Sequence, residues 1–182
     1  MIKLYFFGDS VCFGQYVSPH KTWVHMISQE FPDMLIQNPS VNGDITRTAL
    51  DRMHHDVLSH KPDMVYIQFG INDCNIWDTD RGVTRVPIIS FISNLDEMID
   101  RCKAFGVNTI FLATNHKTGD LKNTEYNEAI RDVSSNLSYV RLIDIESEWE
   151  EGLLMEDGIH LNEDGHILYY NIIREVLLNV NK

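Results

Sequence analysis

The sequence predicts an α/β fold in which a parallel β-sheet lies between two layers of helices, a three-layer α/β/α sandwich. Two observations indicate this fold: short apolar runs alternate with amphipathic segments along the 182 residues, and the apolar runs are hydrophobic almost throughout. Such runs suit strands that are buried on both faces. Alternating strands and helices are typical of a parallel sheet with right-handed crossovers. A chain of this length is expected to form one domain, residues 1–182.

Five apolar runs are expected to form the strands of this sheet. They cover residues 2–7, 34–38, 63–69, 107–113 and 139–145. Pro62 directly precedes the third run, and a proline at that place ends the helical segment before it.

Five amphipathic segments are expected to form helices. They cover residues 21–31, 45–59, 88–105, 122–137 and 163–180. In the third segment, apolar residues recur at helical spacing and Gly106 supplies a C-terminal stop. The last helix opens with Asn162 as its N-cap and two acidic residues in its first turn, which suits the helix dipole. The intervening segment 74–87 is long and irregular, and is expected to be a loop.

Residues that could carry chemistry follow four of the predicted strands. They form four blocks: Gly8-Asp9-Ser10, Asn38 to Gly43, Gly70-Ile71-Asn72-Asp73, and Asp157-Gly158-Ile159-His160. Ligands of open parallel sheets bind outside the carboxyl ends of the strands. The four blocks are far apart in the sequence, and they are therefore expected to meet at one edge of the sheet.

Together the four blocks contain the groups that acyl transfer through a serine requires. A serine hydroxyl is a poor nucleophile unless a base is held beside it, and His160 would be that base. Asp157 lies three residues earlier, close enough to bind Nδ1 of His160 and leave Nε2 facing Ser10. The Ser10 N–H, the Gly43 N–H and the Asn72 side chain would donate hydrogen bonds to a developing oxyanion.

The four blocks resemble those of the SGNH hydrolases, also called the GDSL esterase/lipase family. This family is named for a serine, a glycine, an asparagine and a histidine in separate blocks, which here correspond to Ser10, Gly43, Asn72 and His160. Val11 stands where the family usually has leucine. The resemblance spans nearly the whole chain and implies a flavodoxin-like sandwich with strand order 2-1-3-4-5. It also implies the triad Ser10–His160–Asp157, without a metal or an organic cofactor.

Composition and charge exclude several classes of function. The net charge is −12 and no basic stretch is present, which disfavours nucleic acid and anionic membrane surfaces as partners. No secretory signal and no run of transmembrane length is visible. The three cysteines fit reduced thiols in a cytoplasmic protein. Cys102 is expected in the core, whereas Cys12 and Cys74 lie close to the candidate site, where a reactive role stays open. The oligomeric state does not follow from the sequence.

Four further residues are candidates for substrate contacts. Asn115 and His116 directly follow the fourth strand at the same edge of the sheet, with a loop N-cap as the alternative reading. Trp77 in the 74–87 loop and Phe13 near Ser10 would form an apolar wall for an acyl or sugar group. Trp23, which shares helical spacing with Ile27, fits better in the core.

The sequence therefore predicts a serine ester hydrolase that acts through an acyl-enzyme on a small-molecule ester. The chain is compact and has no lid longer than 74–87, which favours a short acyl group, such as acetyl on a carbohydrate. The alternatives are a lysophospholipase- or thioesterase-type lipid hydrolase, and an acyltransferase with the same triad. A flavodoxin-like binding module is disfavoured because it has no need for the Asp157–His160 pair. A metal site that includes Asp157 and His160 is also disfavoured, because it would leave Gly43 and Asn72 without a role.

Overall fold

The fold is a five-stranded, all-parallel sheet in the order β2-β1-β3-β4-β5. It is seen in a computed structural model of the chain, which describes residues 1–119 and 123–180. The strands are β1 (Ile2–Gly8), β2 (Met34–Gln37), β3 (Met64–Gln68), β4 (Thr109–Ala113) and β5 (Val140–Ile143). The predicted fold class, strand order and all five strands are confirmed, with strand ends shifted by one or two residues.

The two central strands bring the first and third sequence blocks side by side. Gly8, the last residue of β1, is in register with Gln68, the last residue of β3. Every residue of β3 is buried, as is β1 from Leu4 onward, which is expected of strands covered on both faces. The edge strand β2 instead alternates between half-buried and exposed residues. The blocks that follow β1 and β3 therefore leave the sheet from adjacent positions.

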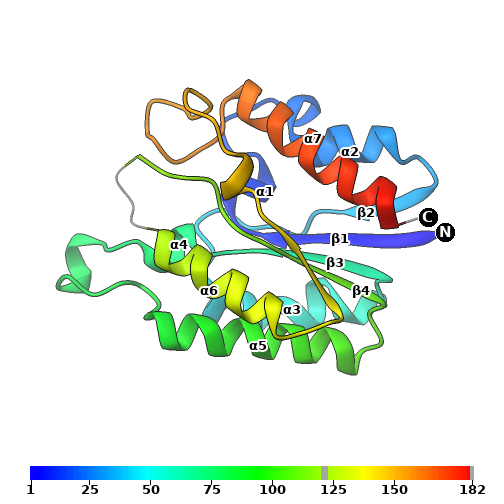
Figure 1. Cartoon of the computed structure of the whole chain (residues 1–182), viewed down its shortest axis with the longest axis horizontal. Coiled ribbons are helices and arrows are strands. Elements are labelled where there is room, and N and C mark those ends of the chain that lie inside the picture. Colours follow the sequence, from blue (N-terminus) through cyan, green and yellow to red (C-terminus); the bar gives the residue numbers. More distant parts are fainter. Residues whose placement is uncertain (120–122, 181–182) are drawn as a thin grey trace.

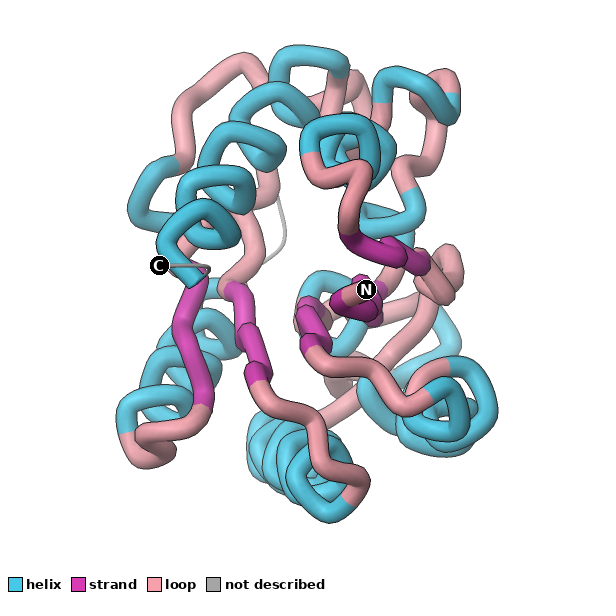
Figure 2. Tube along the Cα trace, turned by 90° about the vertical axis from the view of Figure 1, so that its right-hand side faces the viewer, coloured by secondary structure: helices cyan, strands magenta, loops and turns pink. Residues whose placement is uncertain are grey.

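Two layers of helices cover the sheet (Figures 1 and 2). On one face α2 (Trp23–Glu30) packs against α7 (Glu163–Val180), and on the other face α5 (Ile88–Ala104) packs against α3 (Thr46–Asp56) and α6 (Thr124–Ser135). All five predicted helices are present, with ends shifted by three residues at most. The predicted start of the fourth helix at residue 122 lies outside the described residues. No helix within residues 1–119 and 123–180 is long and apolar enough to span a bilayer.

Several one-turn helices lie in segments that the sequence predicts as loops or helix ends. They are α1 (Ser10–Phe13), α4 (Ile71–Cys74) and the 3₁₀ turns η1 (Pro19–Lys21), η2 (Leu58–His60), η3 (Asp78–Asp80) and η4 (Glu146–Glu148). A single turn contains too few residues to show helical periodicity, so no pattern predicts it. Two of them, α1 and α4, directly follow β1 and β3 and carry candidate site residues.

The apolar core has two parts, one on each face of the sheet. Under α2 and α7, the Trp23 ring lies edge-on to Phe6 at 4.9 Å, and Tyr66 packs against both. Trp23 is fully buried, which confirms its place in the core. On the other face, α5 contributes an apolar stripe that includes Phe91 and Cys102. The packing on both faces fixes the position of the strands. Their carboxyl ends lie to the left in Figure 1, near α1 and α4.

Candidate active site

A tight turn at the end of β1 places Ser10 at the start of α1. Gly8 is needed there because a Cβ at this position would lie 2.8 Å from the carbonyl oxygen of Gln68 on the neighbouring strand. Asp9 caps the helix: its Oδ1 accepts the N–H of Val11 at 2.9 Å. Gly14 then ends the helix after one turn, with a left-handed φ of 84°. The Ser10 side chain is consequently held at the carboxyl edge of the sheet.

Ser10, His160 and Asp157 form one hydrogen-bonded row. The Ser10 Oγ lies 3.0 Å from Nε2 of His160, and Nδ1 of His160 lies 2.6 Å from Oδ2 of Asp157. Ser10 is 4% exposed and the His160 side chain 14% exposed, so the reacting atoms are largely shielded from bulk water. Because the carboxylate accepts a hydrogen bond from Nδ1–H, Nε2 carries no hydrogen and can accept the proton of the Ser10 hydroxyl.

The loop before α7 fixes the Asp157 carboxylate from several sides. Its Oδ1 accepts the backbone N–H groups of Ile159 at 2.9 Å and His160 at 3.0 Å, while Oδ2 accepts the His160 ring. Burial would raise the pKa of Asp157, but these hydrogen bonds outweigh it and hold the pKa below its ordinary value. The carboxylate therefore stays charged beside the imidazole.

The three predicted oxyanion donors lie on segments that surround the Ser10 turn. The loop that holds Gly43 reaches this turn through Val41, whose N–H donates to the Gly8 carbonyl at 3.1 Å. Gly43 has a φ of 73°, and neither its N–H nor that of Ser10 has a hydrogen-bond partner within the described parts of the chain. Asn72 Nδ2 donates to Oδ2 of Asp9 at 3.1 Å, which orients the amide and leaves its second hydrogen for a ligand.

Two buried carboxyl groups, Asp9 and Asp73, brace this arrangement. Burial raises the pKa of Asp9 to about 7, with a further contribution from the negative charge of Asp73. Asp73 lies directly after Asn72, and its Oδ1 accepts the N–H of Thr46 at 2.9 Å and the Thr46 hydroxyl at 2.5 Å. Asp73 thereby ties the loop of Asn72 to the start of α3. Both acids thus hold neighbouring loops in place through hydrogen bonds.

Two exposed aromatic side chains form the rim of the site. The Tyr16 ring lies edge-on to the His160 ring at 5.0 Å and is 67% exposed. Its φ of 70° is a conformation that a tyrosine rarely adopts, and no sequence signal distinguished this residue. Trp77, one of the predicted wall residues, is 52% exposed and stacks on the Arg85 guanidinium at 3.9 Å. Arg85 Nη1 in turn donates to the Gly43 carbonyl at 3.2 Å, so this pair lies next to the Gly43 turn.

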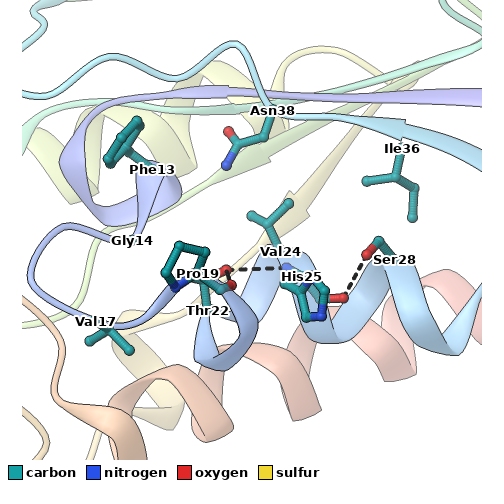
Figure 3. A pocket seen from close by; sticks show the side chains of 10 residues that line it. All are labelled: Phe13, Gly14, Val17, Pro19, Thr22, Val24, His25, Ser28, Ile36 and Asn38. Carbon is teal, nitrogen blue, oxygen red and sulfur yellow. Dashed lines mark hydrogen bonds between the residues drawn. The ribbon is translucent and has the colours of Figure 1, made fainter.

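Phe13, the other predicted wall residue, lines a cavity of about 360 Å³ on the side of α2. Figure 3 shows Phe13 and Asn38 on one side of this cavity and Val24, His25 and Ser28 of α2 on the other. Asn38 Nδ2 donates to the Cys12 carbonyl at 2.8 Å, which ties the edge of the cavity to α1. Phe13 is 52% exposed and lies three residues after Ser10, so this cavity begins close to the nucleophile in the sequence.

The structure does not support the predicted substrate contacts at Asn115 and His116. Both residues are 0% exposed. His116 is covered by α7 and the loop before it, whereas the Asn115 backbone is bonded to Asn127 of α6. Asn115 Nδ2 donates to the Phe69 carbonyl at 2.7 Å, and the two ring nitrogens of His116 are bonded to Tyr169 and the Ile159 carbonyl. Their hydrogen bonds run into the protein, so neither side chain can contact a substrate directly.

The cysteines and His166 are also buried. Burial raises the pKa of Cys12 well above its ordinary value and that of Cys74 to about 12, which keeps both thiols protonated and argues against a reactive role. His166 accepts the N–H of Trp23 through Nδ1 at 3.2 Å and belongs to the core. Within residues 1–119 and 123–180, no three histidine, cysteine or acidic side chains are grouped as metal ligands.

A serine, a histidine and an aspartate in one hydrogen-bonded row at the carboxyl edge of a parallel sheet is the arrangement by which serine hydrolases are recognised. The chain belongs to the GDSL-like lipase/acylhydrolase family, which it matches over residues 6–168. It is an ester-hydrolysing enzyme.

Relatives of known name agree with this assignment. The chain is 26% identical to an arylesterase of Vibrio mimicus over 172 residues, which cover 87% of this chain and 79% of the relative. It is also similar in structure to a lipase/acylhydrolase of Enterococcus faecalis, with 25% identity and a TM-score of 0.80 over 97% of this chain and 95% of that one. An acetylxylan esterase of Geobacillus stearothermophilus shares the fold at 18% identity, with a TM-score of 0.79 over 94% of this chain and 92% of the other.

Proposed function

We propose that the protein is a single-domain serine esterase in which Ser10 is the nucleophile, His160 the general base and acid, and Asp157 the group that orients His160. The observation that carries this proposal is the row of short contacts from Ser10 Oγ to His160 Nε2 at 3.0 Å and from His160 Nδ1 to Asp157 at 2.6 Å. These are the distances that proton transfer between a nucleophile and a positioned base requires.

In the first half of the reaction, Ser10 Oγ attacks the ester carbonyl carbon while its proton moves to Nε2 of His160. The charged Asp157 stabilises the imidazolium that forms. The tetrahedral intermediate then collapses: the bond to the leaving alcohol breaks, and His160 gives that alcohol its proton. In the second half, His160 takes a proton from water as the water oxygen attacks the acyl carbon. The bond between the acyl carbon and Ser10 Oγ then breaks, His160 returns the proton to Oγ, and the acid leaves.

The negative oxygen of each tetrahedral intermediate would be held by the Ser10 N–H, the Gly43 N–H and the Asn72 amide. The two backbone groups have no partner to give up within the described residues, and Asp9 holds the Asn72 amide in place. Donors that need no rearrangement during the reaction stabilise its transition state most effectively.

The substrate we infer is an ester with a short acyl group, such as acetyl, on an aryl or carbohydrate alcohol. Two relatives support this inference, since they are named as an arylesterase and an acetylxylan esterase. The surroundings of the Gly43 turn are polar, with the half-buried Arg85 bonded to its carbonyl, and suit a small acyl group better than a long apolar chain. The exposed rings of Tyr16 and Trp77 offer flat apolar faces to the alcohol part.

We infer that the protein acts in the cytoplasm. All three cysteines are unpaired and buried, which supports a reducing compartment and hence the cytoplasm.

A series of p-nitrophenyl esters with acyl chains from acetyl to decanoyl tests the substrate class. We expect kcat/KM to be highest for acetyl or propionyl and to fall steeply beyond butyryl, because the polar surroundings of the Gly43 turn disfavour a longer apolar chain. A maximum at octanoyl or decanoyl would instead indicate the lipid-hydrolase alternative. Product analysis with an acceptor alcohol completes the test, because a new ester in place of the free acid would indicate an acyltransferase.

A further inference from the structure

A chain of buried polar side chains connects the nucleophile helix to the loop that carries His160. Cys12 of α1 donates through Sγ to Oε1 of Gln68 on β3 at 3.4 Å. Gln68 Nε2 donates to the hydroxyl of Tyr169 on α7 at 3.2 Å. The Tyr169 hydroxyl lies 2.8 Å from Nδ1 of His116, and Nε2 of His116 lies 2.8 Å from the carbonyl oxygen of Ile159. This row of hydrogen-bonded side chains thus ends at Ile159, one residue before His160.

The donors and acceptors of this chain allow one arrangement of protons. A carbonyl oxygen can only accept, so Nε2 of His116 carries the hydrogen, and Nδ1 accepts from the Tyr169 hydroxyl. The Tyr169 oxygen then accepts from the Gln68 amide, whose own oxygen accepts the Cys12 thiol hydrogen. In each of these hydrogen bonds the acceptor is the group nearer to Ile159. The thiol, amide, hydroxyl and imidazole groups that form the row all have hydrogen-bond partners. His116 is therefore a neutral donor whose tautomer is set by its partners.

Burial keeps His116 in this state. The residue is 0% exposed, and its ring packs on the Trp149 ring with centroids 4.7 Å apart. Burial lowers the pKa of His116 to about 4, so its ring stays neutral at pH 6 and above. Asn123 Nδ2 donates to the His116 carbonyl at 2.8 Å and holds the backbone at the same point. The His116 ring and backbone are therefore held in one position inside the protein.

His116 contacts the carbonyl group of Ile159, which directly precedes His160 and so affects its position. The N–H of Ile159 is bonded to Asp157 at 2.9 Å and its carbonyl to His116 at 2.8 Å, so the Ile159 backbone is held from both ends. The bond from Met155 N–H to the His160 carbonyl lies within the loop, and the Gly119 N–H, from the segment after β4, donates to the Gly158 carbonyl. The His116 bond anchors the loop to the segment after β4 and, through Tyr169, to α7.

We propose that His116 is a positioning residue, which fixes the Ile159 carbonyl and thereby holds His160 Nε2 opposite the Ser10 hydroxyl. This inference rests on the proposed roles of Ser10 and His160. An error of about 1 Å in the placement of a catalytic group can cost about 100-fold in rate. Loss of the His116 contact should therefore lower the rate of the chemical step and leave substrate binding intact.

Four variants and a short acetyl ester test this proposal. We expect His116→Leu, which removes the donor at similar volume, to lower kcat about 10- to 100-fold with KM changed less than about twofold. His116→Gln keeps an amide donor for Ile159 and should recover most of the lost kcat. Tyr169→Phe removes the hydroxyl that donates to Nδ1 of His116 and orients its ring, and should lower kcat about threefold or more. Tyr170→Phe is the matched control: its hydroxyl lies on the outside of α7, 3.4 Å from Glu30, and kcat should not change.

The outcomes separate this inference from the proposed function. A folded His116→Leu with the kcat of the parent enzyme, or a His116→Gln as impaired as His116→Leu, would overturn the positioning role. If His116→Leu does not fold, Tyr169→Phe decides: a kcat equal to that of Tyr170→Phe would likewise overturn it. The esterase mechanism itself fails by a different result, namely full activity in Ser10→Ala.

Discussion

Replacement of Ser10 by alanine is expected to lower kcat/KM by at least about 10⁴-fold, because it removes both the nucleophilic oxygen and the hydroxyl proton that His160 accepts. The side chain that is removed is small and 4% exposed, so the fold and its thermal midpoint should be retained. Initial rates with p-nitrophenyl acetate and a thermal unfolding curve measure the two quantities on the same sample.

Ser135→Ala is the control for this substitution. Ser135 ends α6, is exposed, and donates its hydroxyl to the Asp132 carbonyl at 2.9 Å, far from the site in sequence and on another layer. It should retain full activity. If Ser10→Ala were as active as Ser135→Ala, a serine mechanism at this site would be ruled out.

Asp157→Asn is expected to lower kcat by about 10²- to 10⁴-fold, and to be at least as damaging as Asp157→Ala. The reason lies in the two backbone N–H groups of Ile159 and His160, which donate to Oδ1 at 2.9 and 3.0 Å. They hold the amide oxygen of an asparagine toward the backbone, so its NH₂ faces Nδ1 of His160. The imidazole then carries its hydrogen on Nε2 and cannot accept the Ser10 proton. In the alanine variant, water can still accept from Nδ1.

Steady-state kinetics of the two Asp157 variants, with Asp164→Asn as the control, measure this effect. Asp164 is an exposed acid in the first turn of α7 and should tolerate the change to asparagine. An Asp157→Asn variant that is clearly more active than Asp157→Ala would contradict the proposed role of the carboxylate in setting the tautomer.

Much of the fold and the central part of the site can be predicted from the sequence because local signals carry them. The apolar runs mark all five strands to within two residues, and Gly8-Asp9-Ser10 and Asp157-x-x-His160 each combine a turn with a reactive side chain. Parallel topology then brings the ends of the strands together at one edge. The close contact of Ser10 and His160 follows from this topology, although 150 residues separate them.

The features that could not be predicted depend on contacts between distant segments. Asn115 and His116 follow a strand at the right edge, but α6 covers Asn115, while α7 and its preceding loop cover His116. The bond from His116 to Ile159 spans 43 residues. Nothing in the local sequence indicates that cover. The position of Tyr16 could not be predicted for a different reason. It reaches the His160 ring through a left-handed backbone conformation that tyrosine does not favour.

Covalent trapping with a p-nitrophenyl alkylphosphonate measures whether His160 activates Ser10 as the nucleophile. The reagent would bond its phosphorus to the activated serine oxygen and release p-nitrophenol, and peptide mass spectrometry would locate the adduct. We predict one phosphonyl group per chain on Ser10, loss of esterase activity in proportion to labelling, and much slower labelling in His160→Ala. Inactivation with the label on another residue would show that Ser10 is not the nucleophile, and labelling of Ser10 at the same rate in His160→Ala would show that His160 does not activate it.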